Sequence, residues 1–90
     1  MGKIASDIER KLKAAFQPRH LAVIDESNQH RGHAAWRESG ETHFRVEIIA
    51  PAFAGKSRIE RQRMVYQILV EELAGPVHAL ALDVQAPPEG

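Results

Sequence analysis

The sequence predicts a single α+β domain in which helices cover one face of a three-stranded mixed sheet. Segments 3–16 and 58–74 place apolar side chains at helical spacing, whereas 20–26, 42–50 and 77–84 are aliphatic or alternating and indicate strands. The predicted order is therefore α-β-β-α-β. The first two strands form an antiparallel hairpin with a long loop, and the helical crossover that follows makes the second and third strands parallel.

Composition limits the class of protein. Ninety residues with 43% hydrophobic content fit one domain over residues 1–90, with loose ends at 1–3 and 85–90. Twelve basic and twelve acidic side chains give a net charge of zero, so no overall field attracts nucleic acid or an anionic membrane. The chain has no cysteine, which excludes disulfides and a metal site built from its own thiolates. No apolar run approaches the roughly 18 residues of a membrane span, so we expect a cytoplasmic protein without membrane association. A small domain with a neutral surface does not require self-association, so we expect the isolated chain to be monomeric.

Periodicity defines one amphipathic helix and one half-buried strand. The first helix ends before Pro18, because proline disfavours helical geometry at the preceding residue, and its apolar positions are Ile4, Ile8, Leu12, Ala15 and Phe16. The strand at 42–50 alternates, with a core face and an exposed face. The core face is predicted to hold Phe44, Val46 and Ile48, and the exposed face His43, Arg45 and Glu47.

A capping box opens the second helix. Ser57 is followed three residues later by Glu60, the spacing at which the two residues cap each other's backbone N–H groups, and Gly75-Pro76 ends the helix. Several apolar residues fall within a stripe about 100° wide and are predicted to cover the sheet. They are Ile59, Tyr66, Leu69, Val70 and Leu73.

The hairpin loop from Asn28 to Glu41 is longer than the usual two to five residues and carries His30 and His33. Taken alone, these two histidines fit a solvated loop, and His78 fits a structural residue at a strand end. If the loop folds back to that strand end, His78 could face His30 or His33, which would give a site with two nitrogen ligands. Such nitrogen ligands suit zinc, copper or iron, but the set is incomplete, so a partner would have to finish the site.

A basic segment surrounds the start of the second helix. The segment has four basic residues and a single acidic one, Glu60, and it lies next to backbone N–H groups that favour an anion. The basic residues are Lys56, Arg58, Arg61 and Arg63. Phosphate binding is one interpretation. A solvated first turn with arginine stems packed on the surface is the other.

No catalytic constellation is present in the sequence. There is no GxSxG motif, and Gly55-Lys56-Ser57 lacks the upstream glycine of a phosphate-binding loop. We therefore expect no enzymatic activity.

Three stretches together closely resemble the BolA family: "VIDES" at 23–27, "ETHFRVEIIAPAFAGKSRIERQRMVY" at 41–66 and "EELAGPVHALAL" at 71–82. The resemblance covers roughly residues 4–84 with the motifs in order. It implies a class II KH-like fold and a partner, a monothiol glutaredoxin. It also implies a [2Fe–2S] cluster shared between the two proteins, in which the glutaredoxin cysteine and bound glutathione supply one half of the site.

The resemblance further implies that this chain supplies nitrogen ligands, as on one iron of Rieske-type centres. His78 in the "HAL" motif is one implied ligand, and the loop supplies the other. The "GHA" context favours His33, whereas the distance from "DES" favours His30. His43 in "THF" matches a family position on the exposed face of its strand and is not an implied ligand.

Some proteins of this family are described as DNA-binding transcription regulators of stress and morphology genes. The implied contact is the basic helix start, here Lys56, Ser57, Arg58, Arg61 and Arg63. The turn is "FAGKS" instead of the GxxG of nucleic-acid-binding KH domains, and the chain is neutral, so DNA binding is the alternative to the cluster role.

Overall fold

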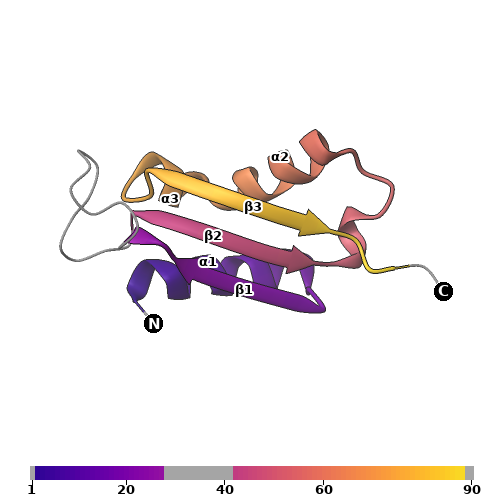
Figure 1. Ribbon diagram of the computed structural model, residues 1–90, viewed down its shortest axis with the longest axis horizontal. Coiled ribbons are helices and arrows are strands. Elements are labelled where there is room, and N and C mark those ends of the chain that lie inside the picture. Colours follow the sequence, from indigo (N-terminus) through magenta and orange to yellow (C-terminus); the bar gives the residue numbers. More distant parts are fainter. Residues whose placement is uncertain (1, 28–41, 89–90) are drawn as a thin grey trace.

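The computed structural model describes residues 2–27 and 42–88 and has the predicted order of elements, with two additions (Figure 1). His30 and His33 lie outside the described residues. The elements are α1 (Lys3–Phe16), β1 (His20–Asp25), β2 (His43–Ile49), the 3₁₀ helix η2 (Pro51–Phe53), α2 (Arg58–Ile68), α3 (Val70–Ala74) and β3 (Ala79–Gln85). Lys3 and Gln85, assigned from sequence to the terminal segments, thus belong to regular elements.

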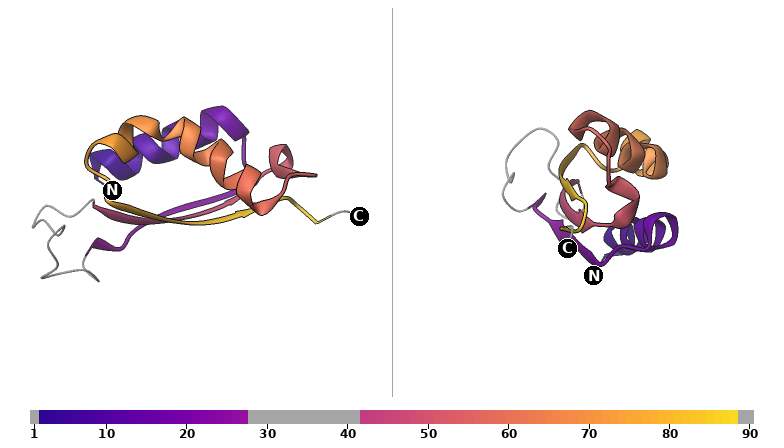
Figure 2. Two further views of the ribbon diagram at one scale, coloured as in Figure 1. Left: turned by 90° about the horizontal axis from the view of Figure 1, so that it is seen from above. Right: turned by 90° about the vertical axis from the view of Figure 1, so that its right-hand side faces the viewer.

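The three strands form the predicted mixed sheet in the order β1-β2-β3. β1 and β2 are antiparallel, with Val23 opposite Val46, and β2 and β3 are parallel, with Phe44 opposite Leu80. The helices all lie on one face of the sheet (Figure 2). The α+β class, the mixed sheet and the one-sided helical layer are therefore confirmed.

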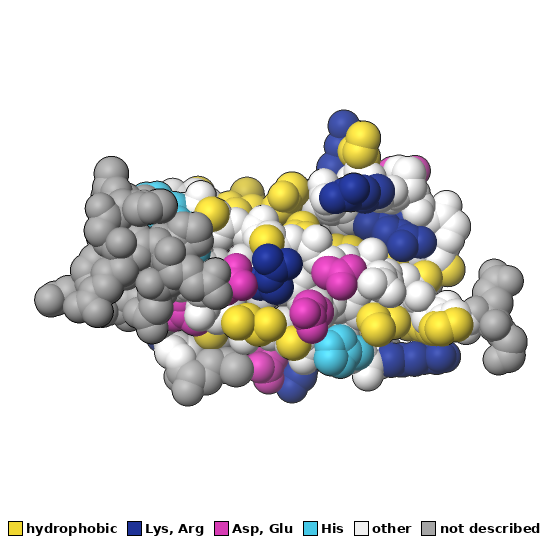
Figure 3. Space-filling model, in the orientation of Figure 1, with side chains coloured by type: hydrophobic (Ala, Val, Ile, Leu, Met, Phe, Trp, Pro, Cys, Tyr) yellow, Lys and Arg dark blue, Asp and Glu magenta, His cyan; other side chains and the backbone are white. Residues whose placement is uncertain are grey.

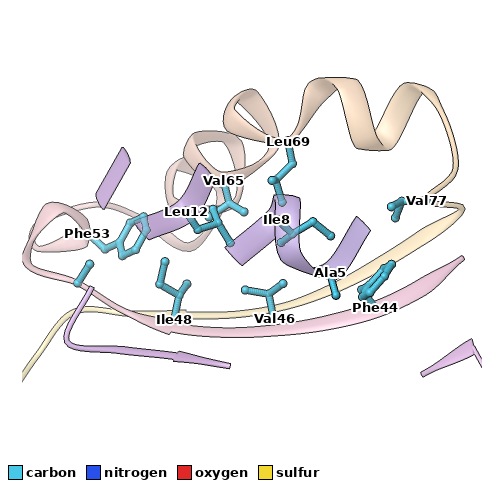
Figure 4. Packing of buried hydrophobic residues seen from close by; sticks show 11 residues of the cluster. Ala5, Ile8, Leu12, Phe44, Val46, Ile48, Phe53, Val65, Leu69 and Val77 are labelled. Atoms are coloured by element: carbon cyan, nitrogen blue, oxygen red, sulfur yellow. The ribbon is translucent and has the colours of Figure 1, made fainter. Parts of the chain in front are cut away.

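The core lies between this helical layer and the sheet (Figure 4). Phe44, Val46 and Ile48 alternate along β2 as predicted and are fully buried against Ile8 and Leu12 of α1. The parallel register places Leu80, Leu82 and Val84 on the same face, where they pack against this core. Within the described residues, no helix is long and apolar enough to cross a membrane.

The predicted helix at 58–74 is two helices. Its backbone leaves helical geometry at Leu69, where φ is −104° and ψ is 22°, and α3 starts at the next residue. The side chain of Leu69 is itself buried in the core. The capping box is confirmed: Glu60 N–H donates to Ser57 Oγ at 3.2 Å, and Ser57 N–H donates to Glu60 Oε1 at 3.4 Å.

The predicted buried stripe of this helical segment is largely wrong. Ile59 is 62% exposed, Val70 61% and Tyr66 38%. Leu69, which is 1% exposed, and Leu73, which is partly buried, pack on the core as predicted. The rest of the stripe that contacts the core is Val65, with Met64 and Ile68 partly buried beside it. The predicted and the observed stripe both repeat at helical spacing. Arg61 lies four residues before Val65 and so places a charge on the observed stripe, which makes that stripe look less apolar in the sequence.

One buried ion pair joins α1 to α3. Lys11 Nζ lies 2.7 Å from Glu72 Oε2, and the side chains are only 19% and 8% exposed. Glu71 Oε1 is farther, at 3.5 Å. The second carboxylate oxygen of Glu72 has no hydrogen-bond partner among the described residues. Lys11 therefore compensates a carboxylate that has left water, and its removal would leave that charge buried.

We predict that Lys11→Met lowers the midpoint of thermal unfolding by several degrees, because it leaves the Glu72 carboxylate buried without a cation. Lys13→Met is the matched control on the same helix. Lys13 pairs with Glu9 at 2.9 Å on the surface, where ion pairs contribute little. Thermal unfolding followed by circular dichroism compares the two. Equal shifts would contradict the assignment.

The same pair predicts a dependence on alkaline pH. The hydrogen bond to Glu72 raises the pKa of Lys11 above its ordinary value of 10.5. Because the pKa of Lys11 is higher in the folded than in the unfolded state, protonated Lys11 stabilises the fold. This stabilisation is complete below the unfolded-state pKa and is lost as the pH rises through the folded-state pKa. The difference in unfolding midpoint between wild type and Lys11→Met should therefore stay constant to about pH 10 and shrink above it. A difference that grew at high pH would contradict this.

Candidate functional site

One end of the sheet gathers the residues that flank the segment 28–41. β1 ends there and β2 begins there, so Ser27 and Thr42 stand at its two sides (Figure 1). Thr42 N–H donates to Ser27 Oγ at 2.9 Å, and the two residues are 0% and 2% exposed, respectively. The base of the predicted histidine loop is therefore a buried, hydrogen-bonded junction.

His78 is fixed to this junction through its backbone. Its N–H donates to the carbonyl of Thr42 at 2.8 Å, and the N–H of Ala79 donates to the same oxygen at 3.2 Å. The preceding turn is held as well, because Val77 N–H donates to the carbonyl of Glu72 at 3.0 Å. His78 itself is exposed. A fixed backbone thus presents an imidazole to solvent.

His43 departs from the prediction of an exposed position. It is 8% exposed, and its Nδ1 lies 2.8 Å from Thr42 Oγ1. Its register partner on the neighbouring strand β3 is Ala79, the residue that follows His78. Its position at the start of β2, inside the junction, accounts for the burial. Alternation in the sequence correctly placed His43 on the strand face opposite Phe44, but it could not predict that this side chain would be buried.

A hollow of about 420 Å³ adjoins His43 and Ala79. The small side chains of Ala79 and Ala81 leave this space, and an ion pair lines it, in which Arg45 Nε donates to Glu26 Oε2 at 3.1 Å. This end of the sheet therefore offers a partner both an exposed imidazole and a recess beside it.

A metal site needs several ligand side chains that lie close together. Across residues 2–27 and 42–88, no group of three or more His, Cys, Asp or Glu side chains could hold a metal ion. Of the predicted ligands, the structure describes His78 alone. His78 is thus an exposed side chain on a fixed backbone, next to the base of the segment that carries the other two candidates.

The opposite end of the sheet carries the basic segment. Lys56, Arg58 and Arg61 line a second hollow of about 420 Å³ with one acidic residue, Asp83 of β3. Lysine and arginine side chains gather over the start of α2 and the turn before it (Figure 3). Hydrogen bonds from Ser57 lower the pKa of Glu60, so the cap carries a carboxylate beside these cations. The excess of positive charge suits an anion.

Arg61 has a structural role within this set. Its Nε donates to the carbonyl of Phe53 at 3.1 Å and its Nη1 to the carbonyl of Val84 at 3.4 Å, so it joins η2, α2 and β3. Ser57 is engaged in the capping box, and Arg63 is exposed but does not line the hollow. The five predicted residues therefore divide into the exposed cations Lys56, Arg58 and Arg63 and the structural residues Ser57 and Arg61.

Comparisons with known proteins agree with this architecture. The family model described as BolA-like protein matches residues 12–89. The chain is 46% identical over 87 residues to an uncharacterized protein of the cobS 5′ region of Sinorhizobium sp, covering 96% of this chain and 94% of that one. It is 47% identical over 79 residues to the DNA-binding transcriptional regulator BolA of Escherichia coli, covering 88% and 71% of the two chains.

A solved structure gives the same result in three dimensions. The BolA domain of SufE1 from Arabidopsis thaliana superposes with a TM-score of 0.88 at 39% identity, covering 97% of this chain and 95% of that domain. Sequence and structure agree over nearly all of the chain, and the chain belongs to the BolA family.

Proposed function

We propose that the chain is a non-enzymatic adaptor that binds a monothiol glutaredoxin and co-ligates a [2Fe–2S] cluster through His78 and either His33 or His30. It would serve iron–sulfur cluster assembly, trafficking or iron-linked regulation. One observation carries the proposal: the backbone of His78 is hydrogen-bonded to Thr42, the residue that directly follows the histidine-bearing segment 28–41. Both implied ligand sources therefore start from one end of the sheet.

Covalent geometry lets either loop histidine contribute. His30 is three residues and His33 six residues beyond Ser27. An extended chain spans at most about 3.6 Å per residue, so their Cα atoms lie within about 11 Å and 22 Å of that of Ser27. Neither upper limit excludes ligation beside His78. Single variants at the two positions decide which histidine is the second ligand.

The chemistry of the chain supports a shared site. With no cysteine, the chain itself offers no thiolate, and the partner's thiolate and glutathione would supply the sulfur. The cluster would supply one-electron redox chemistry and transferable iron and sulfide. Histidine ligation at one iron raises the reduction potential relative to four thiolates. The role of this chain would thus be to orient two imidazoles toward that iron, that of His78 and that of one loop histidine.

We predict that His78→Ala weakens the absorption and circular-dichroism features that distinguish the mixed complex from the glutaredoxin homodimer, and shortens the lifetime of the shared cluster at least tenfold. Loss of an outer-shell partner alone costs about 10–100-fold in metal affinity, and loss of a ligand should cost no less. His20→Ala is the control, because His20 is an exposed histidine of β1 at the opposite end of the sheet, 3.7 Å from Glu47. An unchanged spectrum in His78→Ala would refute the assignment.

The second ligand is identified by single variants at the two loop positions. His33→Ala and His30→Ala are compared in the same reconstitution with glutaredoxin and glutathione. We expect one of them to reproduce the effect of His78→Ala and the other to resemble wild type. If both keep the wild-type spectrum, the second ligand comes from another residue and the proposed site is wrong.

DNA binding is the second candidate function, and the basic hollow at the start of α2 favours it. The Escherichia coli relative is named a DNA-binding transcriptional regulator. In this chain the contacts would come from Lys56, Arg58 and Arg63, with Ser57 and Arg61 holding the helix start in place. Regulation of stress or morphology genes would follow from such binding.

Salt dependence tests this role. Each phosphate contact adds about −0.9 to the slope of log affinity against log salt concentration for duplex DNA. Arg58→Ala should therefore reduce the magnitude of the slope by about one contact. Arg10→Ala, which removes an exposed arginine of α1, is the control and should leave the slope unchanged. Absence of binding at moderate salt, or equal slopes in all three proteins, would exclude this function.

A further inference from the structure

The hydroxyl of Ser27 is the centre of a buried hydrogen-bond network. It donates to Asp25 Oδ1 and accepts from the backbone N–H groups of Thr42 at 2.9 Å and His43 at 3.3 Å. Ser27 N–H also donates to Asp25 Oδ1, at 2.9 Å. A hydroxyl has one proton to donate and two lone pairs, so these contacts engage its donor and its acceptors together.

The network continues from Thr42 to His78. The residue whose N–H is bound by Ser27 offers its carbonyl to the N–H groups of His78 and Ala79. Two hydrogen bonds therefore separate the Ser27 hydroxyl from the backbone of the implied ligand. Ser27 and Thr42 are both almost fully buried, so water has little access to replace a lost bond.

From this geometry we propose that Ser27 is a positioning residue for His78. Its hydroxyl fixes the Thr42 backbone, the Thr42 carbonyl fixes the backbone of His78, and the imidazole is thereby directed toward a cluster held by the partner. This inference rests on the proposed cluster role. It adds a residue that belongs to neither the implied ligand set nor the basic segment.

The requirement is specific to serine. Alanine has no acceptor for the two buried N–H groups, and an unpaired buried donor is costly enough that the backbone would shift to find a partner. Threonine keeps the hydroxyl but adds a methyl group where only 2% of the residue is exposed. A shift at Thr42 moves the oxygen on which His78 depends.

Two measurements on the full-length chain test the proposal. The first is hydrogen exchange of the His78 and Ala79 amides in the protein alone, which needs no partner. The second is the lifetime and circular-dichroism spectrum of a [2Fe–2S] cluster reconstituted with a recombinant monothiol glutaredoxin and glutathione. In Ser27→Ala we expect local loss of protection at these amides and a cluster lifetime shortened about 10–100-fold.

Val65→Ala is the control for lost stability. Val65 is fully buried on α2 and takes no part in the network, so its truncation should weaken protection across the whole domain while leaving the cluster spectrum as in wild type. If Ser27→Ala does not fold, Asp25→Ala replaces it. Asp25 is exposed, and its loss removes the acceptor of the Ser27 hydroxyl, with a smaller effect expected in the same direction.

The outcomes separate the two proposals. Unchanged protection of the His78 amide in Ser27→Ala, or in Asp25→Ala if that variant is used, overturns the inference whatever the partner does. Lost protection with an unchanged cluster lifetime also overturns it, because His78 would then not need this support. If the wild-type chain forms no cluster complex with the glutaredoxin, the proposed function fails, while lost protection would still establish the coupling between Ser27 and His78.

Discussion

The parallel pairing of β2 with β3 determines where His78 and the basic segment at the start of α2 lie. Parallel neighbours begin at the same end of a sheet, so the chain must cross over through η2, α2 and α3 before it can form β3. The residue before β3, His78, consequently returns to the residue before β2, Thr42. The start of α2 is left at the other end, where β2 finishes. One pairing thus places the implied cluster ligand and the basic segment at opposite ends of the domain.

This separation bears on whether the two proposed roles can coexist. β2 has seven residues, and a strand rises about 3.3 Å per residue, so the two ends are about 20 Å apart. A partner bound at the His78 end does not have to cover the start of α2. The two surfaces are nevertheless joined by rigid elements, because Arg61 bonds the start of α2 to the β3 carbonyl of Val84.

Much of the fold could be predicted because local patterns specify it. The alternation along β2 gave its core face, and the Ser57–Glu60 spacing gave the start of α2. The core-facing side of α2 could not be predicted, because Arg61 lies on it and satisfies its guanidinium with carbonyls of distant elements. The hydrogen bonds of Ser27 could not be predicted either, because "VIDES" resembles a family motif but does not indicate the bond from Thr42, 15 residues later. Such features depend on tertiary hydrogen bonds, which single-sequence periodicity does not contain.

Two backbone carbonyls fix the consecutive residues Val77 and His78, the second of which is the implied ligand. Thr42 accepts from the N–H of His78, and Glu72 accepts from the N–H of Val77, while the carboxylate of Glu72 pairs with Lys11 of α1. The helical layer and the sheet therefore both fix the backbone at this point, although the imidazole stays exposed. In the proposed complex, a chain without cysteine would contribute little to the shared cluster beyond the nitrogens of its two histidine ligands. Their value depends on how little conformational entropy is lost when they bind, and a backbone held from both sides reduces that loss before the partner arrives. The buried ion pair of the core and the ligand at the sheet end are thus parts of one arrangement, because the residue that carries the buried charge also supports the turn into His78.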